Sequence, residues 1–326
     1  MLTVPAALLV RSAYQRRGIY FTNMNSIERP YTLLTDQIKN LQQRGLVINN
    51  SSETNYYFLH IGYHRLSGYW QFLQQNKISN TFITGANFNQ VIELYNFDRE
   101  LRLLLLDAIE RIEISFRAIL INMMCSAYGS DWLTEKDIFF SEDRMNDVIE
   151  TINRELDRSE EEDIKKQNES ACGLTYPPAW ITLHSLSFGT LSRIYGNFKN
   201  DIKEKKIIAN VYGLPKAIWL QNWVHVVSMI RNYCAHHSLI CYRLFTFLPR
   251  EIQNVRLPWI KKIPAVGSIE SKQLYYQLCI VRYLLHTASP GNDFSYRLME
   301  LFVKYRGIDL ERMGFLENWD EEDLWQ

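Results

Sequence analysis

An arginine and a histidine stand five positions apart at Arg231 and His236, directly after an apolar stretch with helical spacing. The guanidinium group is planar and permanently charged, and it can hold a phosphate through two parallel hydrogen bonds. The imidazole group titrates near neutral pH, so it can give or take a proton during a reaction. These are two of the roles that RNA cleavage without a metal requires. The pair therefore indicates a nuclease-like site.

The spacing of these residues sets a geometric condition. On a regular helix, residues five apart differ by roughly 140° around the axis, whereas Asn232 and His236, four apart, share a face. Either the helix ends or kinks near Cys234, or Arg231 and His236 act from different chains across a two-fold interface. A symmetric dimer would bring two copies of each group into one cleft. The simpler interpretation is a structural cap, with the arginine paired to a carboxylate and the histidine facing the last carbonyls.

Composition limits the classes of protein that this chain can belong to. The 326 residues are 47% hydrophobic, which is ample for a core without disulfide bonds, and 36 basic residues balance 36 acidic ones. A surface that binds nucleic acid must therefore be local. Five scattered cysteines without a CxxC pair argue against a disulfide framework and a zinc site, so we expect a reducing cytoplasm. Separately, we expect no bound metal and no cofactor.

The beginning of the chain carries no recognisable targeting signal. Its first ten residues are apolar, lack a basic region and are too short to cross a bilayer, so we expect neither a signal peptide nor a membrane span. Residues 1–29 are expected to be a leader without stable structure, with Met24 as an alternative start. The remainder, 30–326, is predicted to be a single domain with an N-terminal part 30–86, a core 87–245 and C-terminal helices 246–326.

The periodicity of apolar residues predicts an all-α fold. One helix without glycine or proline is expected over 87–128, with Gly129 ending it. Three acid-first pairs four residues apart are expected on its surface: Asp98 with Arg102, Asp107 with Arg111, and Glu113 with Arg117. Segment 63–70, YHRLSGYW, is predicted to be a tight, packed turn, and 141–170 a solvent-facing charged helix that frays into a loop. Further helices are expected over 32–44, 53–61, 271–287 and 294–305, and a helix with Pro215 in its first turn is expected to lead to Arg231, with Trp219 and Trp223 in the core.

Five ordered blocks carry a resemblance to a known family. They are HRLSGYW at 64–70, LYNFDRELRLLLLDAIERIEISFR at 94–117, PAWITLHSLSFGTLSRIY at 178–195, WLQNWVHVVSMIRNYCAHH at 219–237 and MGFLENW at 313–319. In this order they resemble the bacterial abortive-infection family typified by AbiD and AbiF, which is similar to the HEPN superfamily of α-helical nucleases. The resemblance implies a HEPN-type helical bundle with additional N- and C-terminal helices.

The same resemblance implies an activity and the residues that perform it. It implies a metal-independent ribonuclease whose cleft forms where two such domains meet. The motif arginine matches Arg231, its polar neighbour matches Asn232, and its histidine best matches His236. The chain departs from the family where 238–243 read SLICYR instead of an arginine, a tryptophan and an asparagine, and where His184 replaces a usual acidic residue.

Other residues near the motif are weaker candidates for binding substrate. The candidates are His237, Tyr233, Tyr242, Arg243, Arg99 and Arg111. Arg243 stands one helical turn beyond the place of the missing arginine, and the two tyrosines flank the motif, where a ring can stack on a base. Asp98 and Glu110 lie in the second block with Arg99 and Arg111, but a charged helix face is the default interpretation for such residues.

These observations predict a cytoplasmic, homodimeric endoribonuclease, a hydrolase of an anti-phage abortive-infection or toxin–antitoxin system. Arg231 would hold and neutralise the phosphate, and His236 would act as acid or base. Asn232 would orient the histidine or the phosphate. The product would be a 2′,3′-cyclic phosphate. The first alternative is a non-catalytic protein that binds a small structured RNA as partner or antidote. The second is a purely structural partner of another defence protein.

Overall fold

The computed structural model describes residues 32–326 except 77, 159–176, 251 and 253. Over these residues the chain is predominantly helical, which confirms the predicted all-α class. The described strands, β1 (Gln74–Asn76) and β2 (Thr81–Phe82), form one short antiparallel ribbon. No helix in the described ranges is long and apolar enough to cross a membrane. The predicted leader, residues 1–29, lies outside the described part of the chain.

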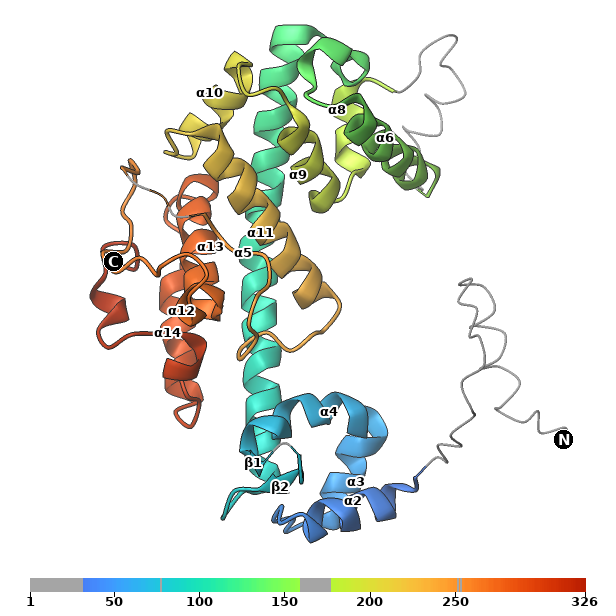
Figure 1. Ribbon diagram of the computed structural model, residues 1–326, viewed down its shortest axis with the longest axis vertical. Coiled ribbons are helices and arrows are strands. Elements are labelled where there is room, and N and C mark those ends of the chain that lie inside the picture. The colour runs from blue at the N-terminus through green and yellow to red at the C-terminus, as the bar shows by residue number, and fades with distance from the viewer. Residues whose placement is uncertain (1–31, 77, 159–176, 251, 253) are drawn as a thin grey trace, which may run out of the picture.

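Helix α5 (Phe88–Tyr128) runs through the molecule, and the other elements are arranged along it (Figure 1). It begins with a capping box, in which the side chains of Asn87 and Gln90 each accept a hydrogen bond from the backbone N–H of the other. It ends at Gly129, whose φ of 80° suits a residue without a Cβ. The prediction of one long helix over 87–128 is confirmed, and at about 1.5 Å per residue it spans roughly 60 Å.

Three helices gather near the N-terminal end of α5: α2 (Leu34–Gln43), α3 (Ser51–His60) and α4 (Tyr63–Trp70). The prediction of a packed turn over 63–70 was wrong, because this segment is helix α4. Leu66, Tyr69 and Trp70 recur at helical spacing, and all three are buried. Their burial outweighs the cost of a glycine inside a helix, about 1 kcal/mol at Gly68.

Helix α6 (Glu142–Asp157) begins the predicted charged segment but is not wholly solvent-facing. Its buried side chains, Met145, Val148, Ile152 and Leu156, form one face that packs against α9 (Phe188–Asn197). The rest of the charged segment, 159–176, lies outside the described residues. Two shorter helices, α8 (Ala179–Thr182) and α10 (Lys203–Val211), lie before and after α9.

Helix α11 (Ala217–Ala235) carries the sequence motif and packs against α5, α9, α10 and α13. Trp219 and Trp223 are buried, as predicted for core residues. The helix is preceded by Lys216 as its N-cap, so Pro215 lies outside the first turn, in contrast to the prediction. The extended backbone that Pro215 imposes on its predecessor suits the entry to a helix equally well.

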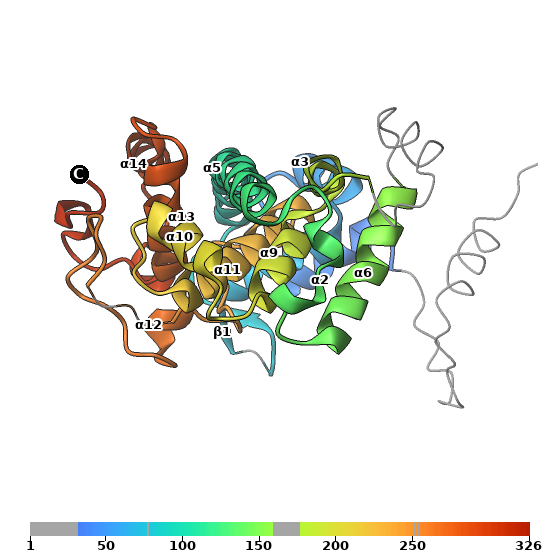
Figure 2. The same cartoon turned by 90° about the horizontal axis from the view of Figure 1, so that it is seen from above.

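The C-terminal third packs alongside α5 on the side away from α6 (Figures 1 and 2). It consists of α12 (Ile269–Lys272), α13 (Leu274–Ala288) and α14 (Phe294–Lys304). The last two helices agree closely with the predicted ones. Viewed from above, α11 lies between α13 on one side and α9 on the other, so its motif is held by neighbours from both halves of the chain.

A buried lysine makes the stability of this fold depend on pH. Lys205 is 1% exposed, and its Nζ donates to the carbonyl of Phe198 at 2.7 Å and to Oδ1 of Asn200 at 3.2 Å. Burial lowers the pKa of Lys205 to about 8. Folding therefore disfavours the charged amine, and this penalty is present in full below pH 8 and disappears as pH rises toward the ordinary lysine pKa.

We expect the contribution of Lys205 to the free energy of unfolding to rise by about 1.5 kcal/mol between pH 8 and 9.5. Urea unfolding of wild type and Lys205→Met at both pH values would measure it as a difference between the two proteins. The difference in the free energy of unfolding between Lys205→Met and wild type should favour the variant more at pH 8 than at pH 9.5. Equal differences at the two pH values would contradict the assignment.

Candidate functional site

The end of α11 presents the motif residues. The last helical residue is Ala235, and His236 is the C-cap, whose N–H donates to the carbonyl of Asn232 at 2.9 Å. The N–H of His237 donates to the carbonyl of Cys234 at 3.0 Å, and His237 has a φ of 56°, in the left-handed region. The helix therefore ends near Cys234, which is one of the two arrangements that the spacing allows.

Arg231 turns from α11 toward the long helix α5. Its Nε lies 4.0 Å from Oε2 of Glu113, and 40% of its side chain is exposed. Glu113 is held more closely by Arg117, whose Nη2 lies 2.7 Å from Oε1. Burial raises the pKa of Glu113, and the two arginines oppose that shift. Since its carboxylate contact is long and its side chain is accessible, Arg231 keeps capacity to hold a phosphate.

A groove of about 590 Å³ lies beside Arg231 along α5. Its other lining residues are Leu106, Asp107, Glu110, Glu113, Ile114 and Arg117. Three of these residues are carboxylates, but Asp107 is paired with Arg111 and Arg297, and Glu113 is paired with Arg117 and Arg231. Much of the negative charge of the groove is therefore compensated.

His236 and His237 are both exposed, and Asn232 is half-buried. Within the described residues, the imidazole groups of both histidines are free of hydrogen bonds, ion pairs and ring contacts to protein. Arg231 is turned to α5, and no contact joins it to His236. Within a single chain, no hydrogen bond or ion pair between described residues joins these two groups.

A buried polar network lies behind the motif. Asp98 on α5 is 0% exposed, and its Oδ1 accepts hydrogen bonds from the backbone N–H groups of Ile240 at 2.9 Å and Cys241 at 2.8 Å. Its Oδ2 accepts from the hydroxyl of Tyr69 at 2.9 Å and from the guanidinium of Arg102. This carboxylate therefore joins α4, α5 and the segment that follows the motif.

Two arginines complete the attachment of that segment. Nη1 of Arg65 donates to the carbonyl of His237 at 2.6 Å, and Nη1 of Arg102 lies 3.4 Å from the carbonyl of Ser238. A buried ion pair costs desolvation free energy, which is offset only where the charges are fully hydrogen-bonded. Here Asp98 and the two arginines form hydrogen bonds with backbone groups of residues 237–241, at and directly after the histidines. The network fixes the conformation of the chain where the motif leaves its helix.

The sequence prediction missed this network. Asp98 and Arg102 were expected as a surface pair, but both are buried, and only the other two acid-first pairs of α5 are partly exposed. A signal was present in the sequence, because Asp98 stands at a core position of the apolar stripe formed by Leu94, Leu101 and Leu105. A charged residue inside such a stripe must find a partner when it is buried.

The residues flanking the motif are engaged in packing. The guanidinium of Arg243 lies 4.1 Å from the ring centroid of Tyr233, and its Nε donates to the carbonyl of Leu239 at 3.0 Å. The ring of Tyr242 packs edge-on against Phe72, and its hydroxyl accepts a hydrogen bond from the N–H of Asp309. One face of Tyr233 and the hydroxyl of Tyr242 are thus occupied in this structure.

The remaining candidates lie apart from the motif. Arg99 is exposed on α5, and Arg111 pairs with Asp107 at 3.2 Å and lies 3.4 Å from Oγ of Ser289 at the end of α13. The structure joins neither arginine to Arg231 or His236. At the departure from the family pattern, the carbonyl of His184 accepts a hydrogen bond from Arg117 at 3.2 Å. Across the described ranges, no group of three or more histidine, cysteine, aspartate or glutamate side chains is placed to hold a metal ion.

Comparison with known proteins gives one match. A family model described as "Abi-like protein" matches residues 56–241. The matched region begins within α3 and ends at Cys241, so it contains the network around Asp98 and the whole of α11. No curated protein and no solved structure matches the chain.

Proposed function

The chain belongs to the Abi-like protein family, which indicates a function in abortive infection, and we propose that it acts as a metal-independent endoribonuclease of the HEPN type. The proposal rests on the end of α11. There Arg231, Asn232 and His236 are accessible, and the segment after them is fixed by a buried charge network that lies within the matched region. A fixed arrangement of charged and titratable groups favours catalysis, because little reorganisation is needed when charge develops.

The chemistry assigns a role to each residue. Arg231 neutralises the scissile phosphate as a ribose 2′-hydroxyl attacks it, and His236 moves a proton as general acid or base. Asn232 shares a face of the helix with His236 and orients the imidazole or the phosphate. The bond from phosphorus to the 5′-oxygen breaks, which leaves a 2′,3′-cyclic phosphate and a 5′-hydroxyl end.

This reaction needs both an acid and a base, and a two-fold dimer would supply a second copy of His236. The described residues of α11 include no exposed large apolar side chain, so an apolar stripe that would support a dimer is absent from that helix. Exposed apolar side chains lie instead on α5. Ile114, which lines the groove with Arg231, is 57% exposed, and Leu103 is 51% exposed. We propose that two copies pair through the faces of α5 and α11 that meet at this groove.

Placing a charge in this face should separate the subunits. Ile114→Glu would bury a carboxylate in the proposed interface, and we expect the dimer to weaken by about tenfold or more. Ile269→Glu is the matched control, because Ile269 is 63% exposed on α12, away from α5. Sedimentation velocity at micromolar concentrations would measure the oligomeric state. A wild-type monomer, or a dimer that Ile114→Glu leaves unchanged, would contradict the arrangement.

The proposed activity is tested by incubating the purified protein with total cellular RNA in EDTA and mapping the new ends. We expect 2′,3′-cyclic phosphate and 5′-hydroxyl ends. A requirement for Mg²⁺ would contradict the mechanism. Intact RNA together with salt-dependent RNA binding would support instead the alternative of a non-catalytic RNA-binding protein, and the salt slope would count the phosphates contacted.

A further inference from the structure

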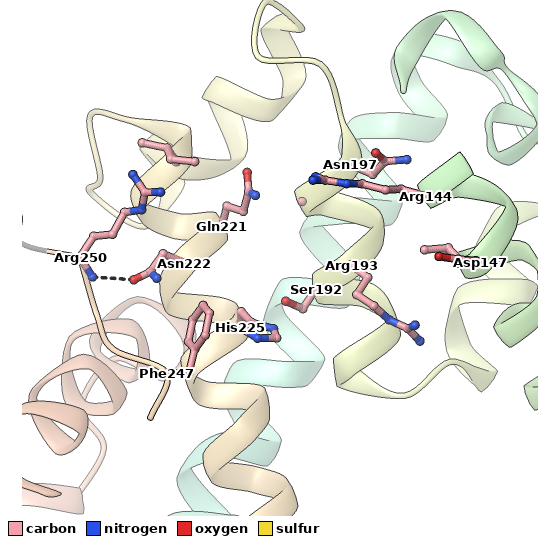
Figure 3. A pocket seen from close by; sticks show the side chains of 13 residues that line it. Arg144, Asp147, Ser192, Arg193, Asn197, Gln221, Asn222, His225, Phe247 and Arg250 are labelled. Atoms are coloured by element: carbon pink, nitrogen blue, oxygen red, sulfur yellow. Dashed lines mark hydrogen bonds between the residues drawn. The ribbon is translucent and has the colours of Figure 1, made fainter. Parts of the chain in front are cut away.

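A second polar pocket lies between α6, α9 and α11, closed on one side by the chain at Phe247 and Arg250 (Figure 3). Its volume is about 340 Å³. It lies on α11 around His225, which precedes His236 by eleven residues and therefore lies about 16 Å from it along the helix. The mechanism proposed above uses none of the residues that line this pocket.

Three arginines from three different segments line the pocket: Arg144 on α6, Arg193 on α9 and Arg250 after α11. Figure 3 shows Arg144 extending from α6 toward α9, while Arg250 lies on the opposite wall beyond Asn222. Among the described residues, none of the three guanidinium groups forms an ion pair with a carboxylate. One carboxylate, Asp147, also lines the pocket, so three guanidinium groups face one acidic side chain, a local surplus of positive charge in a chain with equal numbers of acidic and basic residues. Such a surplus suits an anionic ligand.

The pocket also holds a buried hydrogen-bond acceptor. Asn197 is 2% exposed, and its Nδ2 donates to the carbonyl of Ser141 at 3.1 Å. Its Oδ1 is buried and lacks a hydrogen-bond partner among the described residues. A buried acceptor without a partner costs free energy, so this oxygen favours a ligand that brings an N–H or O–H group.

An aromatic side chain stands at the mouth of the pocket. Phe247 is 41% exposed, and its ring packs edge-on against His225 with 4.2 Å between ring centroids. Burial, followed by the charge of Arg193, lowers the pKa of His225, so the imidazole is uncharged at neutral pH. Asn222 fixes this wall, because its side chain accepts from the N–H of Arg250 at 2.7 Å and donates to the carbonyl of Leu248 at 3.2 Å.

We propose that this pocket binds a free nucleoside di- or triphosphate. The arginines hold the phosphates through charge-assisted hydrogen bonds, Asn197 accepts from the base or the sugar, and Phe247 offers its exposed ring to the base. The volume lies near the lower end of ligand pockets, about 300–1,000 Å³, which suits one nucleotide. This inference does not depend on the proposed ribonuclease activity.

Isothermal titration calorimetry of the full-length protein with ATP, GTP, CTP, UTP and inorganic triphosphate, without divalent metal, tests the pocket. At least one nucleotide should bind. Arg144→Ala and Arg250→Ala should each weaken that affinity about tenfold. Arg154→Ala is the matched control, because Arg154 is exposed on α6 but does not line the pocket. The side chains of Arg144 and Arg250 make no hydrogen bond to described residues, so these variants should fold.

The Phe247→Leu variant distinguishes the contribution of the base to binding from that of the phosphates. It should weaken nucleotide binding and leave the affinity for inorganic triphosphate unchanged. Binding should also persist in His236→Ala, so the pocket and the cleavage site can fail independently. The inference is overturned if no nucleotide binds to wild type, if Arg144→Ala and Arg250→Ala bind as wild type does, or if only RNA oligonucleotides bind.

Discussion

Replacing His236 by alanine is expected to lower the rate of RNA cleavage by about 10²–10⁴-fold, because the variant loses the imidazole that we propose as the proton-transfer group. The imidazole is exposed at the C-cap of α11, and it forms no hydrogen bond, ion pair or ring contact with the described residues. Its removal should therefore leave the fold and the thermal stability close to wild type. Arg231→Ala should reduce the rate by about 10²–10³-fold, because the charge that neutralises the phosphate is lost.

Initial rates on a defined RNA, measured in EDTA at saturating substrate, would check this expectation. His237→Ala decides between the two adjacent histidines and should retain most of the activity. His60→Ala is the surface control, since His60 is exposed on α3. If His236→Ala cleaves as fast as wild type, the assignment of the acid or base is wrong. If His237→Ala alone abolishes cleavage, the role belongs to His237.

Asp98→Ala is expected to destabilise the protein by about 3–5 kcal/mol, the range for breaking a buried ion pair by removing one partner. The substitution leaves the guanidinium of Arg102 buried without its carboxylate, and it leaves the N–H groups of Ile240 and Cys241 without an acceptor. Both consequences add to the cost, because unpaired buried polar groups lose their hydration without replacement.

Urea unfolding followed by circular dichroism would measure this loss. Asp107→Ala is the matched control on the same helix, because Asp107 forms partly exposed ion pairs with Arg111 and Arg297 and should cost about 1 kcal/mol or less. A loss below 1 kcal/mol in Asp98→Ala would contradict the role of the network. If Asp98→Asn folds, reduced cleavage without a change in RNA affinity would show that the carboxylate positions the motif.

Much of the fold follows from local patterns in the sequence. The absence of glycine and proline over 87–128 and the apolar spacing within it predict α5, and Gly129 marks its end. The same kind of pattern predicts α13, α14 and the buried Trp219 and Trp223. These features depend on neighbours within one or two helical turns, so the chain itself contains the information needed.

The sequence allowed an end of α11 near Cys234 as one of two arrangements, and the structure has the helix end there. Residue types and spacing singled out Arg231 and His236, and the family resemblance added Asn232. Their separation around the helix was fixed by helix geometry before any tertiary contact was known. Whether these residues catalyse RNA cleavage stays a prediction, which the variants above test.

Only the tertiary structure decided which charged residues are buried and what they hold. Asp98 and Arg102 read as one more surface pair, but α4 and the segment after His237 enclose them. The pocket around His225 likewise combines residues from α6, α9, α11 and the chain at Arg250. A charged side chain can be buried only where other groups pair with it, and here those partners come from distant parts of the chain. A local sequence pattern does not identify them. Sequence spacing determined the helices and the motif, whereas packing between distant segments determined the environment of each charge.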